Sequence, residues 1–253
     1  MHLDDPEYTE SELYNLLRWE NFCTTKGKIP IVICTNAFTY TWLTAKLVFT
    51  QVFIVEQGFH SLEMHNSNTN AKFSCVYTSP YIHYGNDKHA KHSTWGAELL
   101  IDQLIPRLNF LDPGVEIHLV GEIGKHARKE LAKFKNIHVY GRVNFKKNIT
   151  ILSSCHLGIY PRTFDHKRSI LKIFSYIGAG LPIVTFDLID TEVVKLNSLG
   201  FAVGTVDEFV ARILELKNSS DLMQKYKENI SVFRINFTWS ILAAKMENIL
   251  AKV

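Results

Sequence analysis

The chain has 253 residues, of which 46% are hydrophobic and 21% are charged, as in an ordinary globular protein. This composition excludes a disordered or fibrous chain, and a core of this size needs no disulfide or metal for stability. The four cysteines form no C-x-x-C pair, which argues against a zinc site or a disulfide framework: Cys23, Cys34, Cys75 and Cys155.

The N-terminal sequence is acidic, and no apolar run reaches the length of about 18 residues that a membrane span needs. A signal peptide begins with basic residues and then becomes apolar, so this start does not resemble one. We therefore expect a cytoplasmic protein, with peripheral contact at a membrane left open.

The net charge of +3 is unevenly distributed. Residues 121–172 carry twelve Lys or Arg and three acidic side chains, a local charge of +9 that leaves −6 for the rest of the chain. Such a concentration predicts an anionic partner, either a nucleotide diphosphate or a nucleic acid backbone. The alternative is a set of solvated helix faces, which we favour for residues 125–135.

The first 72 residues predict a small α/β unit. An acidic amphipathic helix over residues 6–24 precedes strands at 29–34 and 52–56, with a helix at 40–49 between them. Residues 61–70 are polar and rich in Asn, which is typical of a linker. This part is too small to bury both faces of its own sheet well.

From residue 73 onward, short apolar runs alternate with amphipathic stretches. Strands are predicted at 73–78, 115–120, 137–140, 156–160, 182–185 and 201–203. Helices are predicted at 94–108, 125–134, 149–153, 169–179, 206–217, 221–233 and 239–251. This alternation predicts a doubly wound α/β domain over residues 73–253, with the ligand crevice beyond the carboxyl ends of a parallel sheet.

The segment 169–185 carries the clearest chemistry. Ser169 is a good helix N-cap, and the free amides of the first turn together with the helix dipole attract anions. Lys172 adds a full positive charge one turn into the helix, and Gly178 and Gly180 favour close packing and a sharp turn. Capped helices that end in Gly are common, so the pattern alone favours a structural helix over a phosphate site.

The string KIFSYIGAGLPIV at residues 172–184 resembles the donor-site helix of GT-B fold glycosyltransferases, where a Lys precedes the pattern (E/Q)Y-x-x-x-G-x-P-(A/V)V. Further segments follow in the family's order: ELLIDQLIPRLNFLDPGVEIHLVG, NIHVYGRV, CHLGIYP and FTWSILAAKMENIL. These segments are similar to the large retaining family four and to xanthan-type glucuronosyltransferases. The resemblance implies a Rossmann-like donor domain at residues 73–253 and a reduced acceptor-side domain at residues 1–72.

The resemblance implies a role in donor binding for ten residues: Ser79, Gly121, Arg142, Val143, Arg162, Ser169, Ile170, Leu171, Lys172 and Ser175. Lys172 would neutralise the diphosphate, assisted by Ser169 and the next two amides. Arg142 and Val143 would flank the base, Gly121 would lie under the nucleotide, and Ser79 would approach the phosphates. An enzyme without a metal needs such cations because negative charge grows on the leaving diphosphate.

Several positions depart from the family pattern. Retaining members carry a pair of Glu around this helix, where the present chain has Arg168 and Ser175. The R-x-x-x-K-G phosphate motif is also missing, and Arg162 or Arg168 would have to compensate. Glu56 and His60 are the candidates for a catalytic carboxylate or base, against a role in a loop or the core.

The histidine-rich stretch around residues 83–92 has a less specific pattern. His83, His89 and His92 accompany Asp87, and their spacing would hold a metal only if the loop folded for that purpose. We favour a loop beside the donor crevice and predict no metal and no cofactor.

The leading hypothesis is a metal-independent glycosyltransferase of the hexosyltransferase type that uses a UDP- or GDP-linked sugar. Its acceptor would be a glycan, a lipid or a protein, and a homo-oligomer or a partner subunit is left open. The alternative is a catalytically silent nucleotide-sugar-binding or regulatory subunit. Nucleic acid binding is disfavoured, because the aromatic and basic residues are not interleaved.

Overall fold

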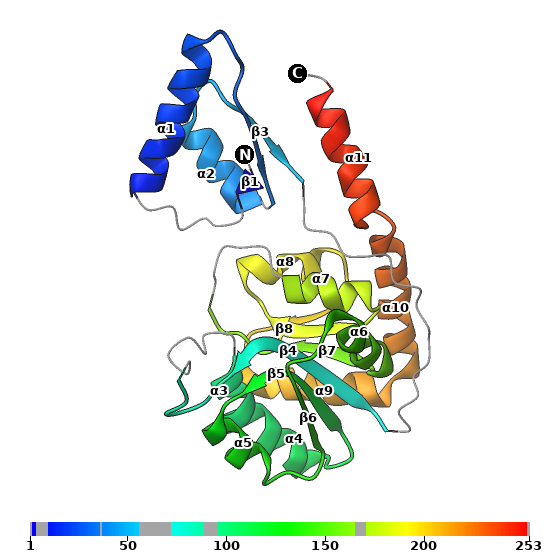
Figure 1. The fold of residues 1–253 in the computed structure, drawn as a ribbon. Helices are drawn as coiled ribbons and strands as arrows, with labels where there is room; N and C mark the ends of the chain where they lie inside the picture. The colour runs from blue at the N-terminus through cyan, green and yellow to red at the C-terminus, as the bar shows by residue number, and fades with distance from the viewer. Residues whose placement is uncertain are drawn as a thin grey trace. The chain divides into compact units, whose positions relative to one another are not determined.

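The computed structural model describes residues 2–3, 10–35, 37–55, 72–88, 96–164 and 171–251, and these form two compact units (Figure 1). The small unit holds the described residues up to 55, Leu171, and residues 235–251. The large unit holds residues 72–88, 96–164 and 172–234. The last helix groups with the first residues of the chain, which differs from the single domain expected over residues 73–253.

The small unit is a three-stranded parallel sheet in the order β1-β2-β3 with helices on both faces. Its elements are β1 (His2–Leu3), α1 (Glu10–Thr25), β2 (Ile31–Cys34), α2 (Ala37–Lys46), β3 (Gln51–Ile54) and α11 (Trp239–Leu250). The helices and strands expected before residue 56 are present, and β1 is an additional strand.

Alternation along β2 explains why the last helix joins this unit. Val32 and Cys34 point to one face of the sheet, where they pack with Leu43 of α2 and Leu16 of α1. Ile33 points to the other face, where it packs with Val55 and with Leu242 of α11. The unit therefore buries its second sheet face with a helix from the far end of the chain, which local sequence could not reveal.

The large unit is a six-stranded parallel sheet in the order β6-β5-β4-β7-β8-β9. Its strands are β4 (Ser74–Ile82), β5 (Glu116–Ile123), β6 (Ile137–Gly141), β7 (Leu157–Tyr160), β8 (Ile183–Phe186) and β9 (Gly200–Val203). Its helices are α3 (Ala97–Leu99), the π-helical η2 (Leu100–Leu104), α4 (Ile105–Leu111), α5 (Lys125–Leu131), α6 (Phe145–Ser154), α7 (Leu171–Gly178), η3 (Ile189–Thr191), α8 (Glu192–Leu196), α9 (Val206–Asn218) and α10 (Ser220–Arg234). The predicted doubly wound α/β fold is confirmed.

The expected and observed elements of the large unit differ most after β6 and after β8. The helix expected at residues 149–153 begins at residue 145, because Asn144 caps it by accepting a hydrogen bond from the Lys147 amide at 2.9 Å. The short helices η3 and α8 were not expected. They lie in the connection between β8 and β9.

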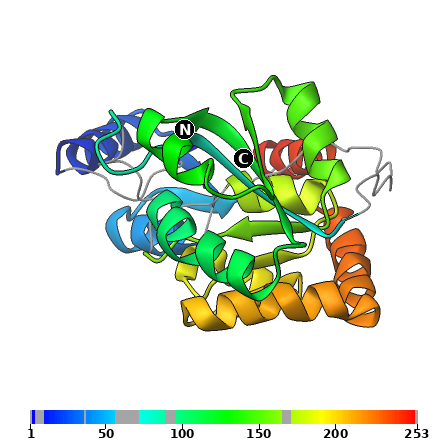
Figure 2. The ribbon, with the colours of Figure 1, turned by 90° about the horizontal axis from the view of Figure 1, so that it is seen from below.

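Two helical layers cover the sheet of the large unit (Figures 1 and 2). On one face, Leu104 of η2 and Phe209 of α9 belong to the same buried cluster as Tyr77 of β4. On the other face α7 approaches β7 closely, since a Cβ atom at Gly158 would lie 2.6 Å from the Tyr176 ring. Among the described residues, no helix is both long and apolar enough to cross a bilayer.

The strand order places a topological switch point beside β4. The chain adds β5 and β6 on one side of β4 and then returns to place β7, β8 and β9 on its other side. The helical segments that follow β4 and β7 lie on opposite faces of the sheet, so the chain diverges at this point. In open parallel sheets this divergence forms the ligand crevice, at the carboxyl ends of the two strands.

Candidate functional site

Lys172, on α7, lies at the switch point between aromatic side chains of the two central strands. Its Nζ is 5.7 Å from the centroid of the Tyr77 ring and 5.4 Å from that of Tyr160. Burial, together with repulsion from Arg162, lowers the pKa of Lys172 to about 7. An anion bound here would favour the ammonium form, so the site gains charge when it gains a ligand.

Arg162 follows β7 and is buried, with 4% of its side chain exposed. Its Nη1 donates to the Tyr160 hydroxyl at 3.0 Å and lies 3.8 Å from Oδ2 of Asp190, whose side chain is 1% exposed. The guanidinium also stacks on Phe164, with Cζ 4.8 Å from the ring centroid. Its Nε and Nη2 are buried and have no hydrogen-bond partner in the part of the chain that the structure describes. Buried N–H groups are nearly always paired, so these two donors are suited to ligand oxygens.

Tyr176 fixes α7 against the two central strands. Its hydroxyl accepts a hydrogen bond from the Thr78 amide of β4 at 3.0 Å and donates one to the Ile159 carbonyl of β7 at 3.2 Å. The helix that carries Lys172 is thereby held across the switch point. The close approach at Gly158 has the same effect, because any larger residue there would push α7 away from the sheet.

A glycine lets the helix after β4 begin against the end of β7. Gly96 has φ +90°, and a Cβ atom there would lie 2.3 Å from the Pro161 carbonyl oxygen. The continuous helical stretch from Ala97 to Leu111 starts at this point. Its first amides therefore lie beside Arg162, where the positive end of the helix adds to the local potential.

Gly121 and Ser79 lie opposite each other on neighbouring strands. A Cβ atom at Gly121, which has φ +146°, would lie 1.7 Å from the Ser79 carbonyl oxygen, so only glycine fits. The buried Ser79 hydroxyl donates to the Tyr81 carbonyl at 2.9 Å. Because the Ser79 O–H already donates within β4, the hydroxyl oxygen could meet a ligand only as an acceptor.

Arg142 and Val143 follow β6 at the same end of the sheet. Arg142 Nη2 forms an ion pair with Oε2 of Glu122 at 2.9 Å, and its guanidinium lies 5.1 Å from the Tyr81 ring centroid. Val143 is half-buried. The carboxyl ends of β4, β5 and β6 thus carry a cation over an aromatic ring.

The other predicted positions divide into two groups. Leu171 is the exposed first residue of α7, and Ser175 is half-buried one turn after Lys172. The remaining ones lie outside the described residues: Glu56, His60, His89, His92, Arg168, Ser169 and Ile170. The structure brings together Lys172 and Arg162 beside Tyr160, and it adds Asp190, which the sequence did not indicate. No spacing signal marks Asp190, because it reaches Arg162 from the connection after β8.

Asp87 has a structural role at the start of α5. Its carboxylate accepts hydrogen bonds from the amides of Tyr84, His126 and Ala127 at 3.0, 2.9 and 3.1 Å. Burial opposes the charged form, but these amides outweigh it and lower the pKa of Asp87 to about 2. With its oxygens engaged in this way, Asp87 acts as a cap for α5.

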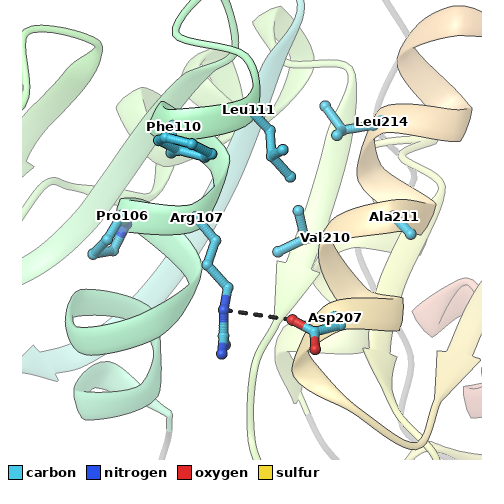
Figure 3. Close-up of a pocket in the computed structure, with 8 residues that line it drawn as sticks. All are labelled: Pro106, Arg107, Phe110, Leu111, Asp207, Val210, Ala211 and Leu214. Carbon is cyan, nitrogen blue, oxygen red and sulfur yellow. Dashed lines mark ion pairs between the residues drawn. The ribbon is translucent and has the colours of Figure 1, made fainter.

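Figure 3 shows an apolar pocket whose lining residues do not include those at the switch point. It measures about 500 Å³ and lies between α4 and α9, with Phe110 and Leu214 among its lining residues. Arg107 Nε and Asp207 Oδ1 form an ion pair across it at 3.4 Å. It shares no residue with the group around Lys172, so the strand topology and the buried cations define the candidate site.

Comparisons with known proteins identify a family and a fold. The model of the family "Glycosyl transferases group 1" matches residues 85–219. Among solved structures, HepE from Anabaena with UDP and glucose has a TM-score of 0.69 at 16% identity, covering 100% of this chain and 71% of HepE. A glycosyltransferase from Rickettsia africae has a TM-score of 0.70 at 13% identity, and the match covers 98% of this chain and 68% of that enzyme. The pneumococcal O-GlcNAc transferase GtfA with UDP and GlcNAc has a TM-score of 0.67 at 17% identity, and the match covers 99% of this chain and 51% of GtfA.

The chain spans about half the length of several of these structures, including GtfA and TarM from S. aureus. Identities of this size establish the fold that the chains share. No curated protein matches the chain in sequence.

Proposed function

The chain belongs to the glycosyl transferases group 1 family, and we propose that it transfers a sugar from a nucleotide-diphosphate donor to a glycan, lipid or protein acceptor. In this proposal the donor is UDP-linked and its diphosphate lies at the switch point between β4 and β7. The protein's own cations take the place of a metal there.

The observation that carries the proposal is the pair of cationic side chains at the switch point. Lys172 has a pKa of about 7 and faces two aromatic rings, and Arg162 has two buried donor nitrogens, Nε and Nη2, that meet no acceptor among the residues the structure describes. When the bond between the anomeric carbon and the diphosphate oxygen breaks, negative charge grows on the leaving group. Preorganised donors in a desolvated site stabilise that charge without a reorganisation cost.

The base of the donor nucleotide is proposed from the ligands of similar structures and from the residues at the ends of β4 and β6. HepE and GtfA were both solved with UDP, which favours uridine over guanosine. Arg142 and Val143 flank the base in this proposal, and Tyr81 supplies a ring beside them. Ser169 and Ile170 as phosphate ligands, and Glu56 and His60 as catalytic groups, stay predictions.

Calorimetric titration of the chain with UDP, GDP and ADP tests the proposal. We expect UDP to bind at least tenfold more tightly than the other two, which is a difference of about 1.4 kcal/mol. Incubation with UDP-sugars should then release UDP by transfer or hydrolysis. Equal or absent binding of all three nucleotides would contradict the proposed donor site.

A second candidate is a nucleotide-sugar-binding subunit without activity of its own. It is favoured by the similarity, at 15% identity and a TM-score of 0.62, to the structure of a GtfA/B complex, in which two proteins assemble. The same experiment separates the candidates, because a silent subunit would bind UDP and release none from any UDP-sugar.

Affinity for UDP should fall as the pH rises above 7. The Lys172 pKa is about 7 in the free protein, and a bound diphosphate raises it by favouring the ammonium. Binding is therefore strongest below pH 7 and weakens through the interval between the free and bound pKa values. Between pH 7 and 9, where phosphate groups are already ionised, we expect a loss of about tenfold or more by calorimetry.

The matched control for this pH profile is Lys172→Arg. A guanidinium remains charged throughout the range, so its profile between pH 7 and 9 should be flat. A wild-type profile as flat as that of the variant would show that Lys172 does not titrate against the ligand.

A further inference from the structure

Two histidines and a glutamate converge on one face of the large sheet, away from the switch point. Glu116 and His118 are two residues apart on β5 and therefore share a face. His138 on β6 is the direct register partner of His118, and the two rings stack with centroids 4.7 Å apart. The parallel pairing of β5 with the edge strand β6 thus brings the three side chains together.

The distances within this cluster suit a small metal ion. Oε2 of Glu116 lies 3.4 Å from Nε2 of His138 and 3.8 Å from Nε2 of His118. One ligand atom from each residue lies within 4.8 Å of the others. A tetrahedral Zn²⁺ with bonds of about 2.0–2.1 Å separates its ligands by about 3.4 Å, which the Glu116–His138 distance already matches, and the two stacked rings would turn to direct both Nε2 atoms at one ion.

The His118 ring is buried and directed into the cluster. Its side chain is 5% exposed, and its Nε2 makes no hydrogen bond among the described residues. Its Nδ1 lies 2.8 Å from the Tyr140 hydroxyl, which fixes the ring. A metal-bound histidine is held in this way, with one nitrogen on a protein partner and the other on the metal.

The other two members are also placed as ligands. The Nε2 of His138 is buried without a hydrogen bond in the described part of the chain, although 41% of the side chain is exposed. Glu116 uses Oε1 for an ion pair with Lys72 at 3.6 Å, which leaves Oε2 facing the imidazoles. The exposed side of His138 gives an ion access to the cluster.

We propose that Glu116, His118 and His138 form a Zn²⁺ site that ties the edge strand β6 to β5. Two imidazoles and one carboxylate are a donor set for Zn²⁺, whereas Mg²⁺ and Ca²⁺ prefer sets made of oxygens. The site lies on β5 and β6, and the proposed donor crevice lies at the carboxyl ends of β4 and β7. It takes no part in sugar transfer and acts on the stability of the sheet edge.

Titration of the chelator-treated chain with ZnCl₂ tests the site, with calorimetry and thermal unfolding as readouts. We expect one equivalent to bind, and a Zn²⁺ concentration of about 100 times Kd to raise the Tm by about 5–10 °C. Co²⁺ in the same site should give the intense visible absorption of tetrahedral coordination. MgCl₂ should show no saturable binding by calorimetry and should not raise the Tm.

The variants His138→Gln and Glu116→Gln should weaken Zn²⁺ binding at least tenfold, since each removes one ligand. The variant His126→Gln is the matched control, because this histidine is half-exposed and outside the cluster. It should bind Zn²⁺ as the wild type does. Absence of saturable binding by the wild type would overturn the proposal, as would undiminished binding in both ligand variants whose circular dichroism shows them folded.

Discussion

The Lys172→Ala variant should bind UDP about 10 to 100 times more weakly than the wild type, because a charge-assisted hydrogen bond contributes about 1.5–3 kcal/mol. The ammonium lies between the Tyr77 and Tyr160 rings, where little water competes for it. Its removal leaves the diphosphate with one cation fewer. The fold should not suffer, since the lowered pKa means that the charged side chain is less favourable in the folded protein than in the unfolded chain.

Calorimetry on Lys172→Ala and on Lys129→Ala checks this prediction. Lys129 is an exposed residue of α5 within the same basic segment, so its loss changes the net charge equally without touching the switch point. We expect UDP affinity to change less than about twofold in Lys129→Ala, because dissolved salt screens the attraction between an exposed charge and a distant ligand. Similar losses of affinity in both variants would mean that the net positive charge of the basic segment attracts the nucleotide and that Lys172 makes no specific contact with it.

The Asp190→Ala variant should lose about 3–5 kcal/mol of unfolding free energy, because it leaves the Arg162 guanidinium buried without its carboxylate. Both side chains are almost fully buried, and Nη1 and Oδ2 lie 3.8 Å apart. An uncompensated buried charge is costly, whereas the intact pair offsets most of the desolvation of its members. Urea denaturation of the chain measures the loss.

A double-mutant cycle with Arg162→Met distinguishes this explanation from a simple loss of packing. The double variant should recover much of the stability lost in Asp190→Ala, since no buried charge remains. Asp187→Ala is the control, because Asp187 pairs with Lys195 at 2.7 Å on the exposed surface and its loss should matter far less. Additive effects of the two substitutions would mean that Arg162 and Asp190 are not coupled.

The sequence by itself determined the strands, most of the helices and the architecture of the large unit. Apolar runs at β4, β5 and β7 separated by amphipathic helices allow only a parallel sheet covered on both faces. It also made Lys172 the predicted cation of the donor site, since a helix that follows a strand in such a sheet begins at the ligand crevice and the resemblance to GT-B enzymes implies a phosphate ligand there. These conclusions depend on local periodicity and on a short motif, which are properties of neighbouring residues.

The tertiary structure decided everything that depends on partners distant in sequence. Arg162 pairs with Asp190 of η3, α11 covers Ile33 from the opposite end of the chain, and His118 meets His138 through strand register. Periodicity shows that a side chain is buried, but it does not show which strand becomes its neighbour. That choice follows from the strand order and from the packing of the whole core, because each strand accepts any partner with a complementary face.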